Sequence, residues 1–176
     1  MKLPRRFCLI GIFTILALAL SYTFFPTRPL PEGVKVEKLL LEKKKRKLTL
    51  LGADGKKIRS YSVSLGANPK GHKEKQGDER TPEGNYVLDF GNPNSRFYRS
   101  LHVSYPNSSD RSRSRKHGNN PGGDIMIHGL PNNLPWIGRW HRWWDWTDGC
   151  IGLTNKEMAE IWKAVKNRKV PIEIRP

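Results

Sequence analysis

The stretch "LTLLGADGKKIRSYSVSL" (residues 48–65) carries the clearest structural pattern in the sequence. Apolar residues with strand-like spacing lie on both sides of the pair Asp54-Gly55. An Asp-Gly pair between two such runs is a strong signal for a tight β-hairpin. The stretch therefore predicts a strand, a turn and a second strand, and it favours a β-rich architecture.

The flanking segments extend this pattern. Residues 34–51 surround a basic cluster at 43–47, which predicts a solvated hairpin end or strand face, with attachment to a membrane surface as the alternative. Residues 86–90 and 101–105 alternate as strands do, and residues 124–128 form a short apolar strand that ends at His128. The polar segments 66–84 and 106–123 are predicted to be long loops.

One amphipathic helix is predicted after residue 153. Thr154 and Glu157 have the spacing of a capping box. Four apolar residues then recur at helical spacing and should face the core: Met158, Ile161, Trp162 and Val165. Asn167 suits a left-handed cap, and residues 170–174 suit a final strand. The fold class is therefore mainly β, with one amphipathic helix near the C-terminus.

The first 25 residues predict a signal or membrane-anchor segment. Lys2, Arg5 and Arg6 precede an apolar run at 7–25, which is long enough to span a bilayer. We expect a retained anchor, with cleavage near the A-x-A-like residues 17–19 as the alternative. Residues 26–33 form a proline-containing linker, and residues 34–176 form one domain. The domain is expected to be exported, on the periplasmic or cell-wall face of the inner membrane.

The charge of the chain indicates an anionic partner. Its 32 Lys and Arg residues outnumber its 16 Asp and Glu residues, which gives a formal net charge of +16. Such a field attracts polyanions. Because an exported protein meets cell wall and lipid surfaces first, we expect an anionic envelope surface and no nucleic acid as the partner.

The two cysteines lie in different settings. Cys8 lies within the apolar run, so Cys150 has no intrachain partner in the exported domain. An unpaired exported cysteine is a reactive thiol, an intermolecular partner or a small buried hydrophobe. Gly149 and Gly152 beside it favour a reactive thiol, since glycine allows an unusual backbone and the close approach of a ligand.

A cysteine nucleophile needs a base, a group that orients the base, and donors for an oxyanion. His128, at a strand end 22 residues earlier, is the candidate base. The backbone N–H groups of Gly149 and Cys150 are the candidate oxyanion hole. The remaining histidines are scattered, which argues against a zinc site, and we expect no metal and no cofactor; they are His72, His102, His117 and His141. His102 is interpreted as a core histidine, with a position facing the cleft as the alternative.

Two motifs in the sequence point to one known protein family. "IMIHGLP" (residues 125–131) and "WTDGCIGLTN" (residues 146–155) resemble the signature of YkuD-type L,D-transpeptidases, also called the ErfK/YbiS/YcfS/YnhG group. The stretches at 48–66, 80–88 and 170–176 also resemble that domain. The resemblance implies a β-sandwich and a cysteine enzyme that acts on peptidoglycan stem peptides. It assigns Cys150 as nucleophile, His128 as base and Gly129, through its carbonyl, as the third member.

Two positions depart from the family pattern. The family often has histidine where this chain has Asp148, and arginine where it has Gly152. The charge of Asp148 opposes thiolate formation unless a cation such as Arg139 or Arg142 pairs with it. The candidate substrate contacts are Thr147, which stands where the family has a small hydroxyl residue, with Asp148, Trp146, Arg139 and Arg142. The tryptophan-rich loop either packs as a lid or forms a wall of the acyl-donor cleft.

The expected function is an L,D-transpeptidase that transfers an acyl group from a tetrapeptide stem, through a Cys150 thioester, to an amine. Two alternatives stay open. One is a cysteine hydrolase on the same fold, with water as the acceptor. The other is a basic, non-catalytic wall-binding module.

Overall fold

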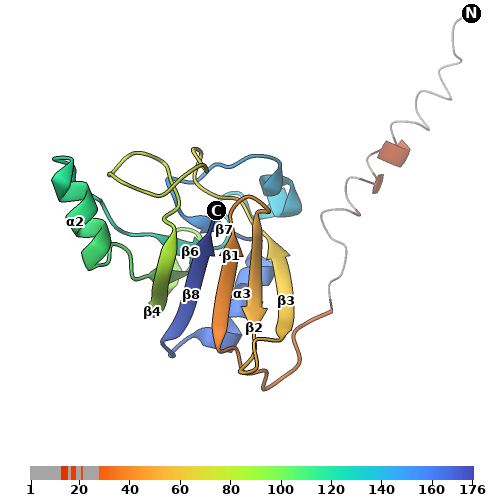
Figure 1. Cartoon of the computed structure of the whole chain (residues 1–176). Helices are drawn as coiled ribbons and strands as arrows, with labels where there is room; N and C mark the ends of the chain where they lie inside the picture. The colour runs from red at the N-terminus through yellow and green to blue at the C-terminus, as the bar shows by residue number, and fades with distance from the viewer. Residues whose placement is uncertain (1–12, 16, 19–20, 22–27) are drawn as a thin grey trace, which may run out of the picture.

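The computed structural model describes residues 13–15, 17–18, 21 and 28–176 (Figure 1). Most of the segment predicted as a signal or anchor, residues 7–25, lies outside the described residues. Within the described part of the chain, no helix has both the length and the apolar character needed to cross a membrane.

Eight strands, two α-helices and one 3₁₀ helix follow in the described domain (residues 28–176). In chain order they are β1 (Lys38–Glu42), β2 (Lys47–Leu51), β3 (Lys57–Ser62), β4 (Gly84–Ser95), β5 (Tyr98–Val103), α2 (Ser108–Lys116), β6 (Met126–His128), η1 (Pro135–Trp143), β7 (Ile151–Gly152), α3 (Asn155–Val165) and β8 (Val170–Arg175). The mainly β class is confirmed.

The strands form a single sheet in the order β3-β2-β1-β8-β4-β5-β6-β7. The last strand, β8, lies in the middle, parallel to β1 and antiparallel to β4. The sheet curls until its two edges meet. At this junction Ser64, which follows β3, exchanges backbone hydrogen bonds of 3.1 and 2.9 Å with Gly152 of β7. This closure brings the β3 edge against the strands that carry the predicted nucleophile and base.

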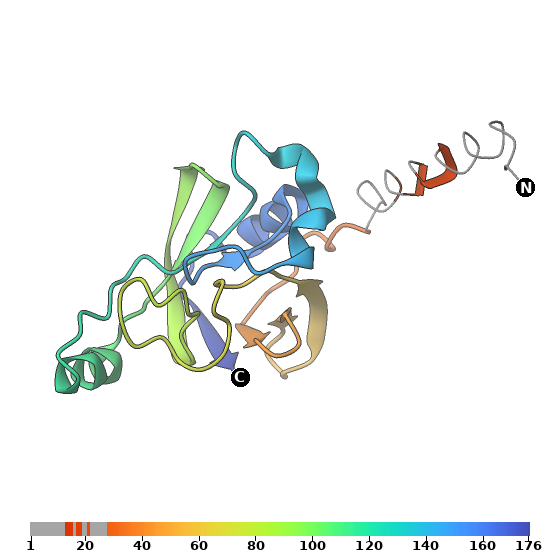
Figure 2. The ribbon, with the colours of Figure 1, turned by 90° about the horizontal axis from the view of Figure 1, so that it is seen from above.

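The predicted helix α3 covers the core. Thr154 and Glu157 form the capping box, and the four apolar residues of the stripe are buried. The helix packs against β5 and β6; seen from above, it lies between the β4–β5 hairpin and β3 (Figure 2). The hairpin predicted around Asp54-Gly55 is also confirmed, with Gly55 at φ +72° and Leu48 paired with Tyr61.

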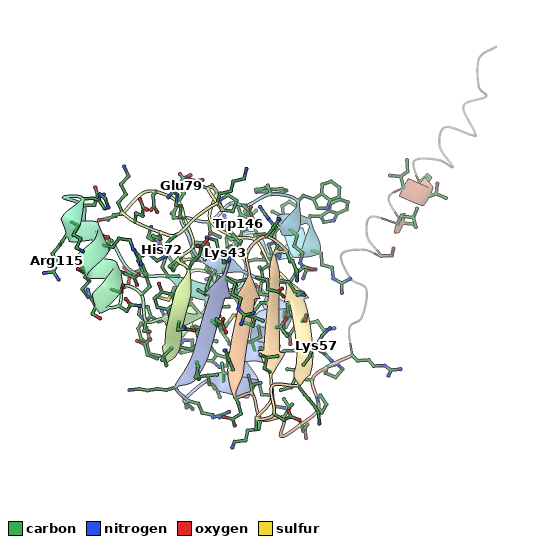
Figure 3. The ribbon with its side chains drawn as sticks, in the orientation of Figure 1. Lys43, Lys57, His72, Glu79, Arg115 and Trp146 are labelled. Carbon is green, nitrogen blue, oxygen red and sulfur yellow. The ribbon has the colours of Figure 1, made fainter. Side chains whose placement is uncertain are left out.

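The basic cluster forms the turn between β1 and β2, as predicted, but one of its lysines points inward. The Lys43 side chain is only 2% exposed, and its Nζ donates to the carbonyls of Gly71 and Thr81 (2.5 and 2.8 Å) and to Glu83 Oε1 (2.8 Å). Burial lowers the pKa of Lys43, against the opposing effect of Glu83. The buried ammonium thus ties the 66–84 loop to the sheet; Figure 3 shows Lys43 level with His72 and below Glu79.

The prediction of a loop over residues 106–123 is wrong. The segment contains α2, which projects from the sheet on the left of Figure 1. Asn107 and Asp110 form a reciprocal cap with two 3.0 Å bonds, and the last turn is basic, which suits the negative end of the helix dipole. Because the helix is polar on nearly every face, it has no apolar period to reveal it. α3 is therefore the amphipathic helix of the domain but not its only helix.

Candidate active site

His128 is the last residue of β6, and Cys150 directly precedes β7, the parallel strand beside it. β6 pairs with β7 so that Ile127 lies beside Ile151 and His128 beside Gly152, which places Cys150 across from Met126. Ile127 and Ile151 are buried in the core. Because side chains alternate along a strand, Cys150, Met126 and His128 occupy the opposite face of the sheet. The structure thus brings the predicted nucleophile and base to one face.

The carbonyl of Gly129 orients the His128 ring. His128 Nδ1 lies 2.7 Å from Gly129 O, so Nδ1 carries the proton and Nε2 is an acceptor in the neutral ring. The side chain is 3% exposed, and burial lowers the pKa of His128, while the bond to the carbonyl opposes that shift. The ring is therefore held as a neutral base with its orienting group in contact.

Two aromatic rings enclose His128. Phe97 lies 4.5 Å from the imidazole between ring centroids, and Trp146 lies 5.6 Å away. The sequence offers no signal for Phe97, because it lies in the β4–β5 turn, far from both motifs. Gly129 is needed here, since a Cβ on it would lie 2.7 Å from Asn155 Oδ1 and 3.1 Å from Phe97 O.

The Cys150 thiol is protonated near neutral pH. Its Sγ accepts a hydrogen bond from Met126 N (3.4 Å) and donates to Asp124 O (3.6 Å). Burial, with the charges of Asp148 and Asp124, raises the pKa of Cys150 to about 11, against the effects of Met126 N–H and Lys73. Attack by this sulfur consequently requires a base.

The turn before Cys150 is fixed by its own residues. Thr147 Oγ1 donates to Cys150 O (2.8 Å) and accepts from Gly149 N (3.3 Å). Gly149 has φ +118°, and a Cβ on it would lie 2.5 Å from Arg80 O. Thr147 therefore holds the backbone of the turn on which Cys150 lies. Since the Gly149 N–H is occupied, the Cys150 N–H is the remaining candidate from the predicted oxyanion hole.

Trp146 explains why the chain has Gly152 where the family often has arginine. A Cβ on Gly152 would lie 3.2 Å from Trp146 Cζ2. The backbone of Gly152 is also hydrogen-bonded in both directions to Ser64. The indole thus crowds the position of a side chain at residue 152, and it also contacts the ring of His128.

Arg142, one of the two cations considered as partners for Asp148, pairs with a different carboxylate. Arg142 Nη2 contacts both carboxylate oxygens of Glu157 at 2.5 Å, so this arginine joins the tryptophan loop to α3. Asp148 is exposed and raises the pKa of Cys150. The roles of all five candidate substrate contacts stay predictions: Arg139, Arg142, Trp146, Thr147 and Asp148.

The tryptophan-rich loop divides into a packed part and an exposed part. Trp146 packs on His128 and His141, whereas Trp136, Trp143 and Trp144 are 68%, 67% and 52% exposed. A cavity of about 150 Å³ lies beneath the loop and is lined by Leu130, Pro131, Leu134, Ile137, His141, Trp144 and Trp146. One part of the loop therefore packs on His128 and His141, and the other part exposes aromatic rings to solvent.

The curled, mainly β domain thus carries a buried, oriented histidine on the sheet face that also bears a cysteine. The model of the L,D-transpeptidase catalytic domain (YkuD) matches residues 37–174, and the chain belongs to this family. The chain is 31% identical over 114 residues to YafK of Escherichia coli K12, which is named as a candidate L,D-transpeptidase. That match covers 64% of this chain and 37% of YafK.

Solved structures agree with this family. The helical cell shape determining protein Pgp2 of Campylobacter jejuni is 29% identical, with a TM-score of 0.62 over 79% of this chain and 47% of Pgp2. Bd1075 of Bdellovibrio bacteriovorus shares the fold at 24% identity, with a TM-score of 0.55 over 83% of this chain and 50% of Bd1075. The chain thus spans about half or less of the length of these relatives.

Proposed function

We propose that the chain is an exported, cysteine-dependent peptidoglycan L,D-transpeptidase. The observation that carries the proposal is the His128 ring, whose Nδ1 is held by Gly129 O on the sheet face that also bears Cys150. Membership of the L,D-transpeptidase family supports a peptidoglycan substrate. The likeness to a protein named for its role in determining cell shape supports a role in wall remodelling.

In the first half-reaction, Cys150 attacks the carbonyl before the terminal D-alanine of a tetrapeptide stem. His128 Nε2 takes the thiol proton as the C–S bond forms, which is needed because the pKa of the thiol is raised to about 11. The Cys150 N–H stabilises the oxyanion. His128 then protonates the leaving amine, and D-alanine departs, leaving a thioester on Cys150.

In the second half-reaction, an amine attacks the thioester carbon. The same imidazole, neutral again after D-alanine has left, accepts the proton that the amine loses. The Cys150 sulfur is the leaving group, and His128 returns the proton to it, so that both the thiol and the neutral imidazole are restored. Phe97 and Trp146 shield His128 on two sides, and exclusion of water at this stage favours the amine over hydrolysis.

The charge of the domain supports work at an anionic surface. The formal net charge is +16, and α2, which projects from the sheet (Figure 1), carries the exposed residues Arg111, Arg113, Arg115 and Lys116. We infer that this field holds the domain near the wall or lipid headgroups, with the peptide chemistry left to Cys150.

Product analysis tests the proposal. The purified chain is given a disaccharide-tetrapeptide with and without a D-amino acid, and the products are identified by mass spectrometry. A cross-linked dimer or an exchanged tetrapeptide is expected, and the Cys150→Ala variant should form neither. Tripeptide as the sole product at every amine concentration would make the protein a hydrolase. Turnover that survives in Cys150→Ala would refute the nucleophile.

A further inference from the structure

The tryptophan-rich loop exposes three indole rings beside the candidate active site. Trp136, Trp143 and Trp144 are all more than half exposed. Trp146, in the same loop, contacts the ring of His128. Exposed indole rings bind ligands through their flat apolar faces, which suits the apolar face of a sugar ring or a lipid interface.

The cavity beneath the loop is lined by a buried histidine that has an unpartnered polar atom. His141 lines this cavity and is 2% exposed. Its Nδ1 lies 3.4 Å from Trp146 Nε1 and 2.9 Å from Ser64 Oγ. An indole N–H can only donate, so Nδ1 is an acceptor and the neutral ring carries its proton on Nε2. No hydrogen-bond partner of Nε2 is found among the described residues.

The ring of His141 stays neutral at physiological pH. Burial, with the charges of Arg142 and His128, lowers the pKa of His141 to about 3. The remaining residues that line the cavity are aliphatic, proline or tryptophan. The cavity therefore combines apolar walls with one neutral N–H donor, which suits a small group that carries a methyl and a carbonyl oxygen.

The size of the cavity selects part of a sugar and not a whole one. Its volume is about 150 Å³, and a cavity of that size holds a molecule such as benzene. An acetamido group fits this space, whereas a substituted pyranose ring does not. Trp144 lines the cavity and is also 52% exposed. A sugar whose acetamido group enters the cavity would therefore lie with its ring at Trp144.

The distance from Cys150 also indicates the sugar. Cys150 lies across from Met126, and Leu130, which lines the cavity, follows Met126 by four residues, or at most about 14 Å of chain. The D-alanine beyond the attacked carbonyl adds one residue, about 3.6 Å, and cannot reach that far. The three stem residues on the other side of the carbonyl, with the lactyl group that joins them to the sugar, cover a similar length.

A lipid surface explains these features less well. A lipid chain offers no acceptor to the Nε2 proton of His141. Arg142, a basic residue of the loop, is 15% exposed and is paired with Glu157 instead of facing an anionic headgroup. The observations therefore favour a neutral saccharide as the occupant of this surface.

We propose that the tryptophan-rich loop is the binding site for an N-acetylated sugar of the peptidoglycan glycan. The acetamido methyl enters the apolar cavity, its carbonyl accepts from His141 Nε2, and the sugar ring stacks on Trp144. The inference rests on the proposed function and names the part of the substrate that lies outside the reaction. The site positions the stem for Cys150 and takes no part in the chemistry.

Saccharide binding tests the site without any turnover. The full chain is titrated with tetra-N-acetylchitotetraose, and the indole N–H signals are followed by NMR. Cellotetraose, which has the same linkage but hydroxyl groups in place of the acetamido groups, should bind several-fold more weakly. Trp144→Ala should weaken binding of the N-acetylated tetramer by about tenfold, whereas Trp144→Phe should keep most of the affinity. Folded His141→Phe should lose the preference for the N-acetylated tetramer.

Donor kinetics test the same site in the reaction. KM is measured for disaccharide-tetrapeptide and for the tetrapeptide without its sugars. Trp144→Ala should raise KM about tenfold for the first donor and leave it unchanged for the second, because a remote contact contributes uniform binding. Phe90→Ala, at a 54% exposed aromatic residue of β4, is the matched control and should keep both KM values.

The outcomes separate this inference from the proposed function. If wild type turns over neither donor, the proposed function fails, and the saccharide titration alone decides the site. If the N-acetylated tetramer does not bind wild type, or binds Trp144→Ala equally well, the site is wrong. Indole signals that respond to anionic phospholipid vesicles but to no saccharide would make the loop a membrane surface and overturn the inference.

Discussion

Alkylation of Cys150 should become steeply faster as the pH rises. With a pKa of about 11, roughly one thiol in 10⁴ is ionised at pH 7. Only the thiolate reacts with iodoacetamide, so each pH unit should multiply the rate by about ten, or about a thousandfold between pH 7 and pH 10. Burial is the main cause of the raised pKa, followed among the raising effects by the charge of Asp148.

A carbapenem should acylate Cys150, because a thiol that attacks a stem-peptide carbonyl should also open a strained lactam. The rate of this acylation should follow a different pH profile, because His128 removes the thiol proton during attack. Burial lowers the pKa of His128 below its ordinary 6.5. A base is active when neutral, which is above its pKa, so acylation should be on its plateau at pH 7. The rate should fall only as the pH drops below 6.5.

The rates of alkylation and of carbapenem acylation can both be measured by intact-mass spectrometry after quenching at a series of pH values. Asp148→Asn removes one of the charges that raise the pKa of Cys150, so its alkylation at pH 8 should be several-fold faster. Asp54→Asn, in the exposed β2–β3 turn, is the control and should leave the rate unchanged. An alkylation rate that is flat from pH 6 to pH 9 would show a preformed thiolate and refute this reasoning.

Three other perturbations follow from the site. Gly129→Ala places a Cβ 2.7 Å from Asn155 Oδ1, so the free energy of unfolding should fall by about 1–3 kcal/mol; an unchanged melting temperature would contradict the packing. Thr147→Val removes the hydroxyl that donates to Cys150 O, and acylation by a carbapenem should slow by about tenfold, whereas wild-type kinetics would deny Thr147 its positioning role. Dialysis against a strong chelator should leave turnover unchanged, and a loss that zinc restores would show that His128 is misassigned as a base.

The sequence predicts the turns and helices whose formation depends on residues close together in the chain. The Asp54-Gly55 turn and the capped helix α3 form where their residues indicate, because turn geometry and capping are decided within a few residues. α2 was missed because a polar helix has no apolar period, although Asn107 and Asp110 hold its cap signal. The curl that joins Ser64 to Gly152 is a long-range pairing that no local pattern encodes.

The candidate site likewise has residues that the sequence motifs predict and contacts that depend on the folded structure. The motifs point to Cys150, His128 and Gly129, and the register of β6 and β7 places them on one face or in contact. The partners of Arg142 and Thr147 could not be predicted, because each depends on which polar group is nearest after folding.

Capture of the thioester tests the central claim most directly. The chain is mixed with a disaccharide-tetrapeptide, quenched in acid within the first turnovers, digested and mapped by mass spectrometry. We predict that the peptide containing Cys150 gains the mass of the disaccharide-tripeptide acyl group, and that His128→Gln forms this adduct far more slowly while Cys150→Ala forms none. Turnover of the stem with no acyl mass on Cys150 at any quench time, or with the mass on another residue, would contradict the account.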